Sequence, residues 1–460
     1  MTTEWREYTP SSTNPWTLQK AGHLYRRAAF GATHAQLEQA VKDGPKATIS
    51  KLMQGTPPSA DFAATSEFMS TPAALPPTAA PTRLAAWWLW RIRNSPHPLL
   101  EKLSVFWHNH FATSQAKVQQ AQYLVGMIRT IHTHALGDFR QLLNEMTFDP
   151  AMLIWLDAKD SRKGQPNENY ARELMELFSL GIGNYTEADI REAARAFTGY
   201  DVKNGRMNFD TKLHDDGEKT VFGKKGKYEA ADVVKLCLAH PACAKFIVKK
   251  LYREFVSDLV EPTDELLKPL VEMYGKTFNT GDVVETMLRS EHFFSDAAYR
   301  QKVKSPVEFA MGLVTGLEGT AGPELLALAC DELGQTLGAP PSVKGWDGGP
   351  TWLNAQTLLT RQNLALALVS TQDSRFGKRC DPVKLLENHK VSGDAETLAF
   401  LLKLFLQNDL PKESQQQITD YQKQSITAKY PSFWSKQDIA EHRTRTVTHL
   451  VLTRPEFQLG

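Results

Sequence analysis

Apolar residues recur with the spacing of helices over most of the chain. A window with apolar positions at i, i+3, i+4 and i+7 presents one apolar face and predicts an amphipathic helix. This pattern covers residues 21–30, 37–54, 82–149, 231–293, 306–337, 354–370 and 395–407. The prolines of Ser95-Pro96-His97-Pro98 break the third of these segments. The pattern predicts an all-α fold.

A pair of helices joined by a turn is predicted in the first half of the chain. The first helix, over 168–180, ends at Gly181, because glycine readily adopts the left-handed conformation that closes many helices. Thr186 caps the second helix, with Asp189 at its third position, and Gly199 lies just past its end.

One large helical domain is expected. Residues 1–20 predict an extended N-terminal arm, residues 21–370 a helical core domain, and residues 371–460 a C-terminal helical extension packed on the core. Pro, Ala, Ser and Thr in 55–81 predict a surface loop. Gly, Lys, Asp and Asn in 200–228 predict an irregular loop with a few short strands or a hairpin. A loop of that length can carry function.

Composition removes several classes of partner. The 460 residues are 42% hydrophobic, which is enough for a sizeable core. The formal net charge of +1 gives no general attraction to nucleic acid or to an anionic membrane. Four scattered cysteines do not make a disulfide scaffold. With no secretory signal and no long apolar run, a cytoplasmic protein without a transmembrane segment is expected, although removal of an export signal would leave the same sequence in the periplasm.

Candidate metal ligands occur in Phe106-Trp107-His108-Asn109-His110-Phe111. Imidazoles bind divalent and iron-type metals. His108 and His110 are two residues apart and point to different sides of an α-helix, so both bind one ion only if the helix ends or distorts there. The alternative is structural, with one histidine bonded to a carbonyl in the core and the other exposed.

A polar edge runs along residues 167–177. Glu168 and Arg172 are i,i+4 neighbours, and Glu173 and Glu176 are i,i+3 neighbours, beside an apolar stripe. Polar groups near a helix start can converge on a ligand. Glu168, Arg172 and Glu173 are therefore candidate catalytic residues, and Glu173 is also a candidate metal ligand. Surface ion pairs are the alternative.

The loop Leu213-His214-Asp215-Asp216-Gly217-Glu218-Lys219 places a histidine, two carboxylates and a glycine within four residues. Such a loop lets short side chains converge on a divalent cation or position a general base. His214, Asp216 and Lys219 are candidate catalytic residues. A solvated turn is the alternative, because Asp-Gly is a common turn signal.

A Gly- and Pro-rich loop over 338–350 predicts a rigid segment that can form a pocket wall. Trp346 and Trp352 offer flat surfaces for stacking on a sugar or another planar group, and Asn354 and Arg361 can supply hydrogen bonds. These four residues are candidate ligand-binding residues. The tryptophans can equally serve to pack the loop onto the helices.

Six motifs occur in a fixed order along the chain. They are His23-Leu24-Tyr25-Arg26-Arg27-Ala28-Ala29-Phe30-Gly31, Phe106–Phe111, Asn167–Phe178 with Gly181, Ala194-Arg195-Ala196-Phe197-Thr198-Gly199, the His214–Lys219 loop and Val343-Lys344-Gly345-Trp346. Together they resemble the DUF1800 family over most of residues 20–370.

The resemblance implies a largely helical fold and names no settled activity. Members are often found beside proteins of the DUF1501 family, which are similar to sulfatases and alkaline phosphatases, and many are exported. It therefore implies a DUF1501-type, sulfatase-like partner and a role in cell-envelope or polysaccharide metabolism. The unsignalled N-terminus departs from the exported pattern.

Three functions are compatible with these residues. The first is an enzyme, with a divalent or iron-type metal at His108, His110 and Glu173 and with Arg172 and Lys219 stabilising developing negative charge. The second is metal-free cleavage of a glycoside by a pair of carboxylates drawn from the helix and the loop. The third is a non-catalytic helical scaffold or partner protein, in which the same groups satisfy one another.

Overall fold

Helices make up most of the described part of the chain, which contains 22 α-helices and two small two-stranded sheets. The computed structural model describes residues 3–371, 373, 375–376, 379–427 and 429–460. One apolar core joins elements from both ends of the chain. The prediction of an all-α fold, with short strands only in the 200–228 loop, is confirmed.

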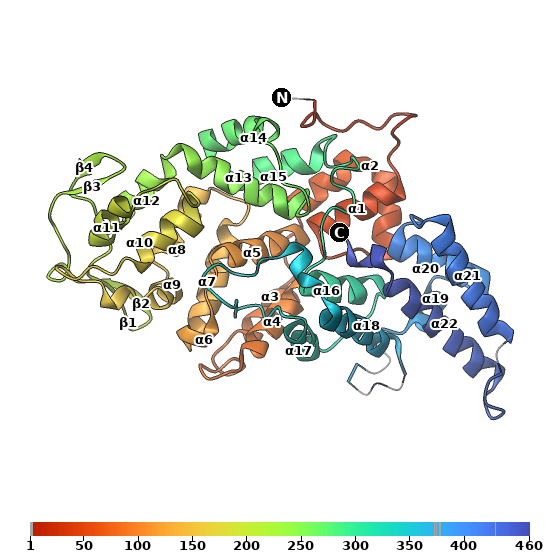
Figure 1. Ribbon diagram of the computed structural model, residues 1–460. Coiled ribbons are helices and arrows are strands. Elements are labelled where there is room, and N and C mark those ends of the chain that lie inside the picture. Colours follow the sequence, from red (N-terminus) through yellow and green to blue (C-terminus); the bar gives the residue numbers. More distant parts are fainter. Residues whose placement is uncertain (1–2, 372, 374, 377–378, 428) are drawn as a thin grey trace.

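Helix α5 lies in the middle of the molecule (Figure 1). It and its surroundings are α4 (Pro81–Asn94), α5 (Pro98–His110), α7 (Ala121–His134), α16 (Pro306–Gly316) and α17 (Pro323–Glu332). Pro98 starts α5, because the first residue of a helix does not need its N–H for the helical ladder. Leu99, Leu103 and Trp107 follow at helical spacing and are fully buried. The segment is therefore core, as its apolar spacing predicts.

The helix–turn–helix unit and both hairpins lie at one end of the molecule (Figure 1, left). Its elements are α6 (Gln115–Val118), α8 (Phe139–Thr147), α9 (Pro150–Trp155), η1 (Ala158–Asp160), α10 (Asn169–Glu173), η2 (Leu174–Ser179), α11 (Glu187–Ala196), β1 (Tyr200–Lys203), β2 (Arg206–Phe209), β3 (Lys219–Val221), β4 (Lys224–Gly226) and α12 (Ala230–Leu238). Strand β1 pairs with β2, and β3 with β4, both antiparallel. Thr186 and Asp189 form the predicted capping box of α11.

The N-terminal arm and helices pack against a second group of helices. This part contains α1 (Leu18–Ala28), α2 (His34–Gln54), α13 (Pro241–Phe255), α14 (Asp264–Thr277) and α15 (Thr280–Arg289). The described part of the arm, from residue 3, has no helix before Leu18, and Glu7 forms a β-bridge with Ser290. Trp5 and Tyr8 are buried, so the arm contributes to the core.

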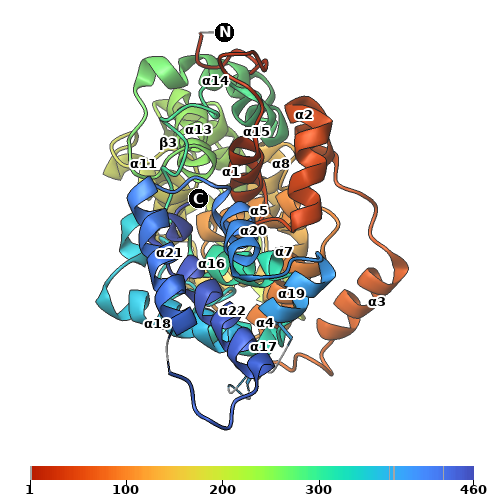
Figure 2. The same cartoon turned by 90° about the vertical axis from the view of Figure 1, so that its right-hand side faces the viewer.

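C-terminal helices cover the opposite end of the molecule (Figure 2). They are η3 (Gly349–Trp352), α18 (Ala355–Val369), α19 (Pro382–Asn388), α20 (Asp394–Leu406), α21 (Lys412–Thr427), α22 (Lys436–Leu452) and η4 (Pro455–Gln458). Helix α22 packs against α18 and α20. Beyond η4, Leu459 forms a β-bridge with Val303 and brings the chain back to the centre.

Two local predictions differ from the structure. The expected loop over 55–81 contains α3 (Ala60–Met69), because Ser59 caps the N–H of Phe62 and the alanines then favour a helix. The helix predicted over 168–180 changes from α10 to a π-helix, η2, where the Ser179 hydroxyl bonds the Leu174 carbonyl. No described helix is both long and apolar enough to cross a membrane.

Candidate functional site

The end of α5 ties three distant segments together. The indole of Trp107 donates to the Ala135 carbonyl at 2.9 Å. The Asn109 side chain pairs with the backbone of Trp346, accepting from its N–H at 2.7 Å and donating to its carbonyl at 3.2 Å. His110 Nε2 lies 3.0 Å from the Phe178 carbonyl in η2. Each polar side chain at this helix end therefore binds a different part of the fold.

His108 and His110 point away from each other. His108 accepts a hydrogen bond from the Gly338 N–H at 3.1 Å, between the rings of Trp88 and Trp346, and burial lowers its pKa to about 4. The pKa of His110 is also lowered, by burial first and by a nearby lysine second. Both histidines are buried. The divergence predicted from their spacing is what the structure contains.

Lys250, on α13, completes the surroundings of His110. Its Nζ lies 3.0 Å from His110 Nδ1 and 3.2 Å from the Leu177 carbonyl. Burial lowers the pKa of Lys250 to about 7. The carbonyls of Leu177 and Phe178 lie in η2. The π-helix therefore supplies one acceptor for α5 and one for α13 and links the two helices.

The polar edge of α10 forms ion pairs with α11. Arg172 donates to both oxygens of Glu187, at 2.9 and 2.8 Å, and to Glu168 at 3.2 Å. Glu173 is half-buried, and burial together with the nearby Glu176 raises its pKa. Glu168 and Arg172 thus form surface ion pairs, the arrangement given above as the alternative to a catalytic role.

The His214–Lys219 loop is held by α11 and by its own backbone. His214 Nδ1 lies 2.9 Å from the Thr198 carbonyl. Asp216 pairs with Lys163 at the surface, at 2.5 Å. Lys219 is buried and donates to the carbonyl of Gly217 at 3.1 Å. The loop is thus an ordered turn in which each of the three candidates has a protein partner.

The four candidate ligand-binding residues are mostly covered. Trp346 and Trp352 are only 8% and 9% exposed and pack on Val303. Asn354 caps α18 through the Thr357 N–H at 2.9 Å. Arg361 is buried and donates to the Lys304 carbonyl at 2.7 Å.

The predicted polar centre is not gathered at one point. Arg172 binds Glu187 at the start of α11, whereas Arg195 at its end binds Asp215 of the loop, at 2.8 Å. Eight residues of helix, about 12 Å, separate these two pairs. No group of three or more His, Cys, Asp or Glu side chains among the described residues could hold a metal ion. The metal-dependent centre at His108, His110 and Glu173 stays a prediction.

A second group of polar residues does come together in the core. It contains six cationic side chains and three carboxylates, and we call it the charge cluster. Its members are Arg26, Arg27, Lys102, Lys302, Lys304, Arg361, Glu254, Asp258 and Glu308. The helices α1, α5, α13, α16 and α18, the segment after α13 that contains Asp258, and the 302–304 segment supply these groups.

Glu308 holds the middle of the charge cluster. It is buried in an ion pair with Lys102, and Lys302 lies 3.7 Å from the same carboxylate oxygen. Its other oxygen accepts from the Ser305 N–H at 2.7 Å and so caps α16. Burial acts to raise the pKa of Glu308, but Lys102 and Lys302 outweigh it and lower the pKa. Lys302 also pairs with Glu254 at 2.8 Å.

Three basic side chains of the cluster, those of Arg27, Lys304 and Arg361, donate hydrogen bonds to neutral groups. Arg27 donates to the carbonyls of Val256 and Ala298, at 3.1 and 2.7 Å. Lys304 donates to the Phe457 carbonyl at 2.7 Å. Burial lowers the pKa of Arg27 and of Arg361 to about 10, and it lowers the pKa of Lys304 well below its ordinary value.

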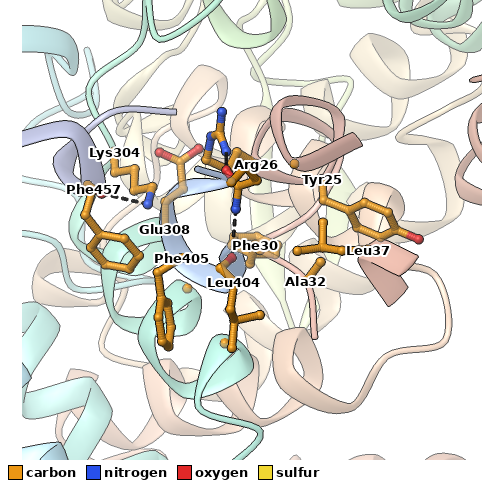
Figure 3. A pocket seen from close by; sticks show the side chains of 15 residues that line it. Tyr25, Arg26, Phe30, Ala32, Leu37, Lys304, Glu308, Leu404, Phe405 and Phe457 are labelled. Atoms are coloured by element: carbon orange, nitrogen blue, oxygen red, sulfur yellow. Dashed lines mark hydrogen bonds between the residues drawn. The ribbon is translucent and has the colours of Figure 1, made fainter. Parts of the chain in front are cut away.

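A cavity of about 40 Å³ adjoins this cluster. Figure 3 shows Arg26, Lys304 and Glu308 at the cavity, together with apolar side chains that include Phe405 and Phe457. The wall is shared by α1, α16 and the C-terminal helices. The cavity thus places basic groups next to a small, partly open space.

A family model, described as a protein of unknown function (DUF1800), matches residues 23–459. The chain belongs to the DUF1800 family. Neither the search of curated proteins nor that of solved structures found a match.

Sequence reasoning missed the charge cluster of this DUF1800 protein, apart from Arg361. Two signals were present. Arg26 and Arg27 lie inside the first family motif, on a short helix with an apolar face. The second is the capping-box spacing of Ser305 and Glu308. The capping box by itself explains the glutamate, so the sequence gives no reason to expect an ion pair at Glu308.

Replacing Gly345 with alanine should destabilise the protein by several kcal/mol. Gly345 has φ +83°, and a Cβ would lie 2.6 Å from the Asn109 carbonyl oxygen, so the change adds a clash of about 1–3 kcal/mol to a backbone cost of about 1–2 kcal/mol. Gly334→Ala is the matched control, because Gly334 has φ +91° and open space around it. Equal losses of unfolding free energy in denaturant for the two variants would show that the contact between α5 and the 338–350 loop is unimportant.

Glu101, also on α5, should make the free energy of unfolding depend on pH in the acidic range. It is buried between Arg91 at 2.9 Å and His132 at 2.8 Å, and although burial opposes them, they lower its pKa from 4.5 to about 2. Its contribution is therefore complete above about pH 4.5 and is lost as the pH falls towards 2. The full contribution is about 3 kcal/mol.

Urea unfolding of the wild type and Glu101→Gln between pH 6 and 2 measures this contribution. The difference between the two free energies should be constant down to about pH 5 and then shrink. Glu67→Gln, which alters an exposed pair with Arg129, should show no such trend. A Glu101→Gln difference that does not change with pH would contradict the assignment.

Proposed function

We propose that this DUF1800 protein binds a small ligand through an anionic group, a carboxylate or an oxyanion, in the cavity beside the charge cluster. One observation carries the proposal: the basic side chains of Arg26 and Lys304 line a cavity whose one described carboxylate, Glu308, is already paired with Lys102, and basic side chains outnumber carboxylates six to three in the adjoining cluster. A bound anion would supply negative charge that these side chains lack.

The electrostatic environment supports an anion at this place. A buried charge is costly unless it is paired. Arg26 donates to the neutral carboxamide of Gln407, and burial lowers the pKa of Arg26. A guanidinium stays charged at neutral pH and therefore attracts an anion. The low dielectric of the protein interior strengthens this attraction.

The size of the cavity limits what enters it. A water molecule needs at least about 10–15 Å³ of such space. The cavity of about 40 Å³ therefore has room for about three waters, or for one carboxylate or oxyanion group. A larger ligand would insert only its charged group, and the remainder would lie outside the cavity.

Acidic sugars are the ligand class that best joins this cavity to the family resemblance. A role in cell-envelope or polysaccharide metabolism involves sugars, and acidic sugars carry carboxylates or sulfate esters. A DUF1501-type, sulfatase-like partner would act on the same class of molecule. We include that partner and a periplasmic location in the proposal. Binding, without turnover, is the function that the cavity supports best.

Arg26→Met should weaken the binding of acetate and of sulfate, measured separately by isothermal titration calorimetry at constant ionic strength. A hydrogen bond to a charged group contributes about 1.5–3 kcal/mol, so the loss should be at least about ten-fold. Lys304→Met removes the second cationic group from the cavity and should also weaken binding. It tests the same site without altering α1.

Arg129→Met is the matched control, since Arg129 forms an exposed ion pair with Glu67 at 2.6 Å. It should bind both anions as the wild type does. The proposal fails if neither anion binds, or if the Arg26 and Lys304 variants, folded by circular dichroism, bind as tightly as the control. The ratio of acetate to sulfate affinity separates a carboxylate from an oxyanion ligand.

A further inference from the structure

We infer that the Gln407 carboxamide occupies the position of a ligand carboxylate, so that the end of α20 is a built-in plug that a carboxylate ligand displaces. The inference rests on the proposed function and names both the ligand group and the regulation of that site. Gln407 is buried at the end of α20, lines the cavity and accepts a hydrogen bond from Arg26 Nη1. Its Nε2 donates to the Leu404 carbonyl at 2.8 Å.

The shape of a carboxamide explains the assignment. A carboxamide and a carboxylate are both planar, and each presents an oxygen to a guanidinium. The amide is neutral, however, and only its oxygen can accept, whereas a carboxylate brings a full charge and two acceptor oxygens. Replacement of Gln407 by a carboxylate would therefore strengthen the interaction with Arg26. A tetrahedral oxyanion does not reproduce this planar geometry.

Helix α1 is shaped to receive the Gln407 side chain. Gly22 lies one turn before Arg26, and a Cβ on it would come within 2.6 Å of Gln407 Cγ and Cδ. A glycine at this point lets the glutamine lie flat on α1 beside the guanidinium. The absence of a side chain at Gly22 therefore leaves room for a planar group beside Arg26.

The backbone at the end of α20 is held independently of the Gln407 side chain. Gln407 has φ +51° and Asn408 has φ +58°, and neither is a glycine. This left-handed backbone closes α20, because the N–H groups of both residues donate to the Leu402 carbonyl. The rest of α20 is anchored separately, by Lys403 to Glu38 at 3.1 Å. The Gln407 side chain can thus leave Arg26 while α20 stays in place.

Acetate titrations of Gln407 variants by isothermal titration calorimetry test the plug. Gln407→Ala empties the position, and we expect acetate to bind at least ten-fold more tightly than to the wild type, with a smaller gain for sulfate. Gln407→Glu supplies an internal carboxylate, and we expect it to abolish acetate binding. Gly22→Ala puts a methyl group against the position that the carboxamide and the acetate share, and we expect it to weaken acetate binding.

Gln415→Ala is the matched control, because Gln415 donates to the Leu410 carbonyl at 2.9 Å and does not line the cavity. It should bind acetate as the wild type does. The plug is overturned if acetate binding depends on Arg26 but is the same in the wild type and Gln407→Ala. A gain for sulfate equal to that for acetate overturns the carboxylate assignment. If acetate binding is independent of Arg26 in every variant, the proposed function itself fails.

Discussion

Glu308 has to stay ionised inside the protein, and the centre of the fold is arranged around that requirement. Its carboxylate is paired with Lys102 from α5 and lies near Lys302, while its second oxygen caps α16. Removing one partner of a buried ion pair typically costs about 3–5 kcal/mol, because the other charge is left uncompensated. Residues separated by about 200 positions are therefore fixed relative to one another by one carboxylate.

The same charge cluster explains why the cavity is more than a packing defect. Cavities left by imperfect packing are lined by apolar groups and stay dry. Here Arg26, Lys304 and Glu308 reach the wall, and the cationic groups rest on carbonyls and a carboxamide. Because Glu308 is already paired with Lys102 and the acceptor for Arg26 is a neutral carboxamide, the space beside Arg26 is suited to an anion. The C-terminal helices close this space, so the part of the chain after residue 370 belongs to the site.

The local pattern of apolar and capping residues is sufficient to predict most helices and several of their ends. The capping box at Thr186 and Asp189 and the divergence of His108 and His110 follow from spacing along one helix, and both are present in the structure. The composition of residues 55–81 predicts a loop, but the cap at Ser59 starts α3 within it. The π-helix depends on carbonyls that bind His110 and Lys250, which are distant in sequence.

The charge cluster could not be predicted in the same way. Arg26, Lys102, Glu308 and Gln407 each have an ordinary local explanation as a charge or amide on an amphipathic helix. Their relation comes from packing of α1, α5, α16 and α20, which no spacing along the sequence encodes. The sequence-based candidates, by contrast, were dense local clusters, and the structure satisfies most of them through ion pairs and caps.

A pair of crystal structures, with and without acetate at equal ionic strength, tests the central claim most directly. The account predicts a carboxylate bound to Arg26 in the cavity of the acetate structure, with the Gln407 side chain turned away from α1. In the acetate-free structure, Gln407 should lie on Arg26. Acetate found only on the outer surface, with Gln407 bound to Arg26 in both crystals, would contradict the account.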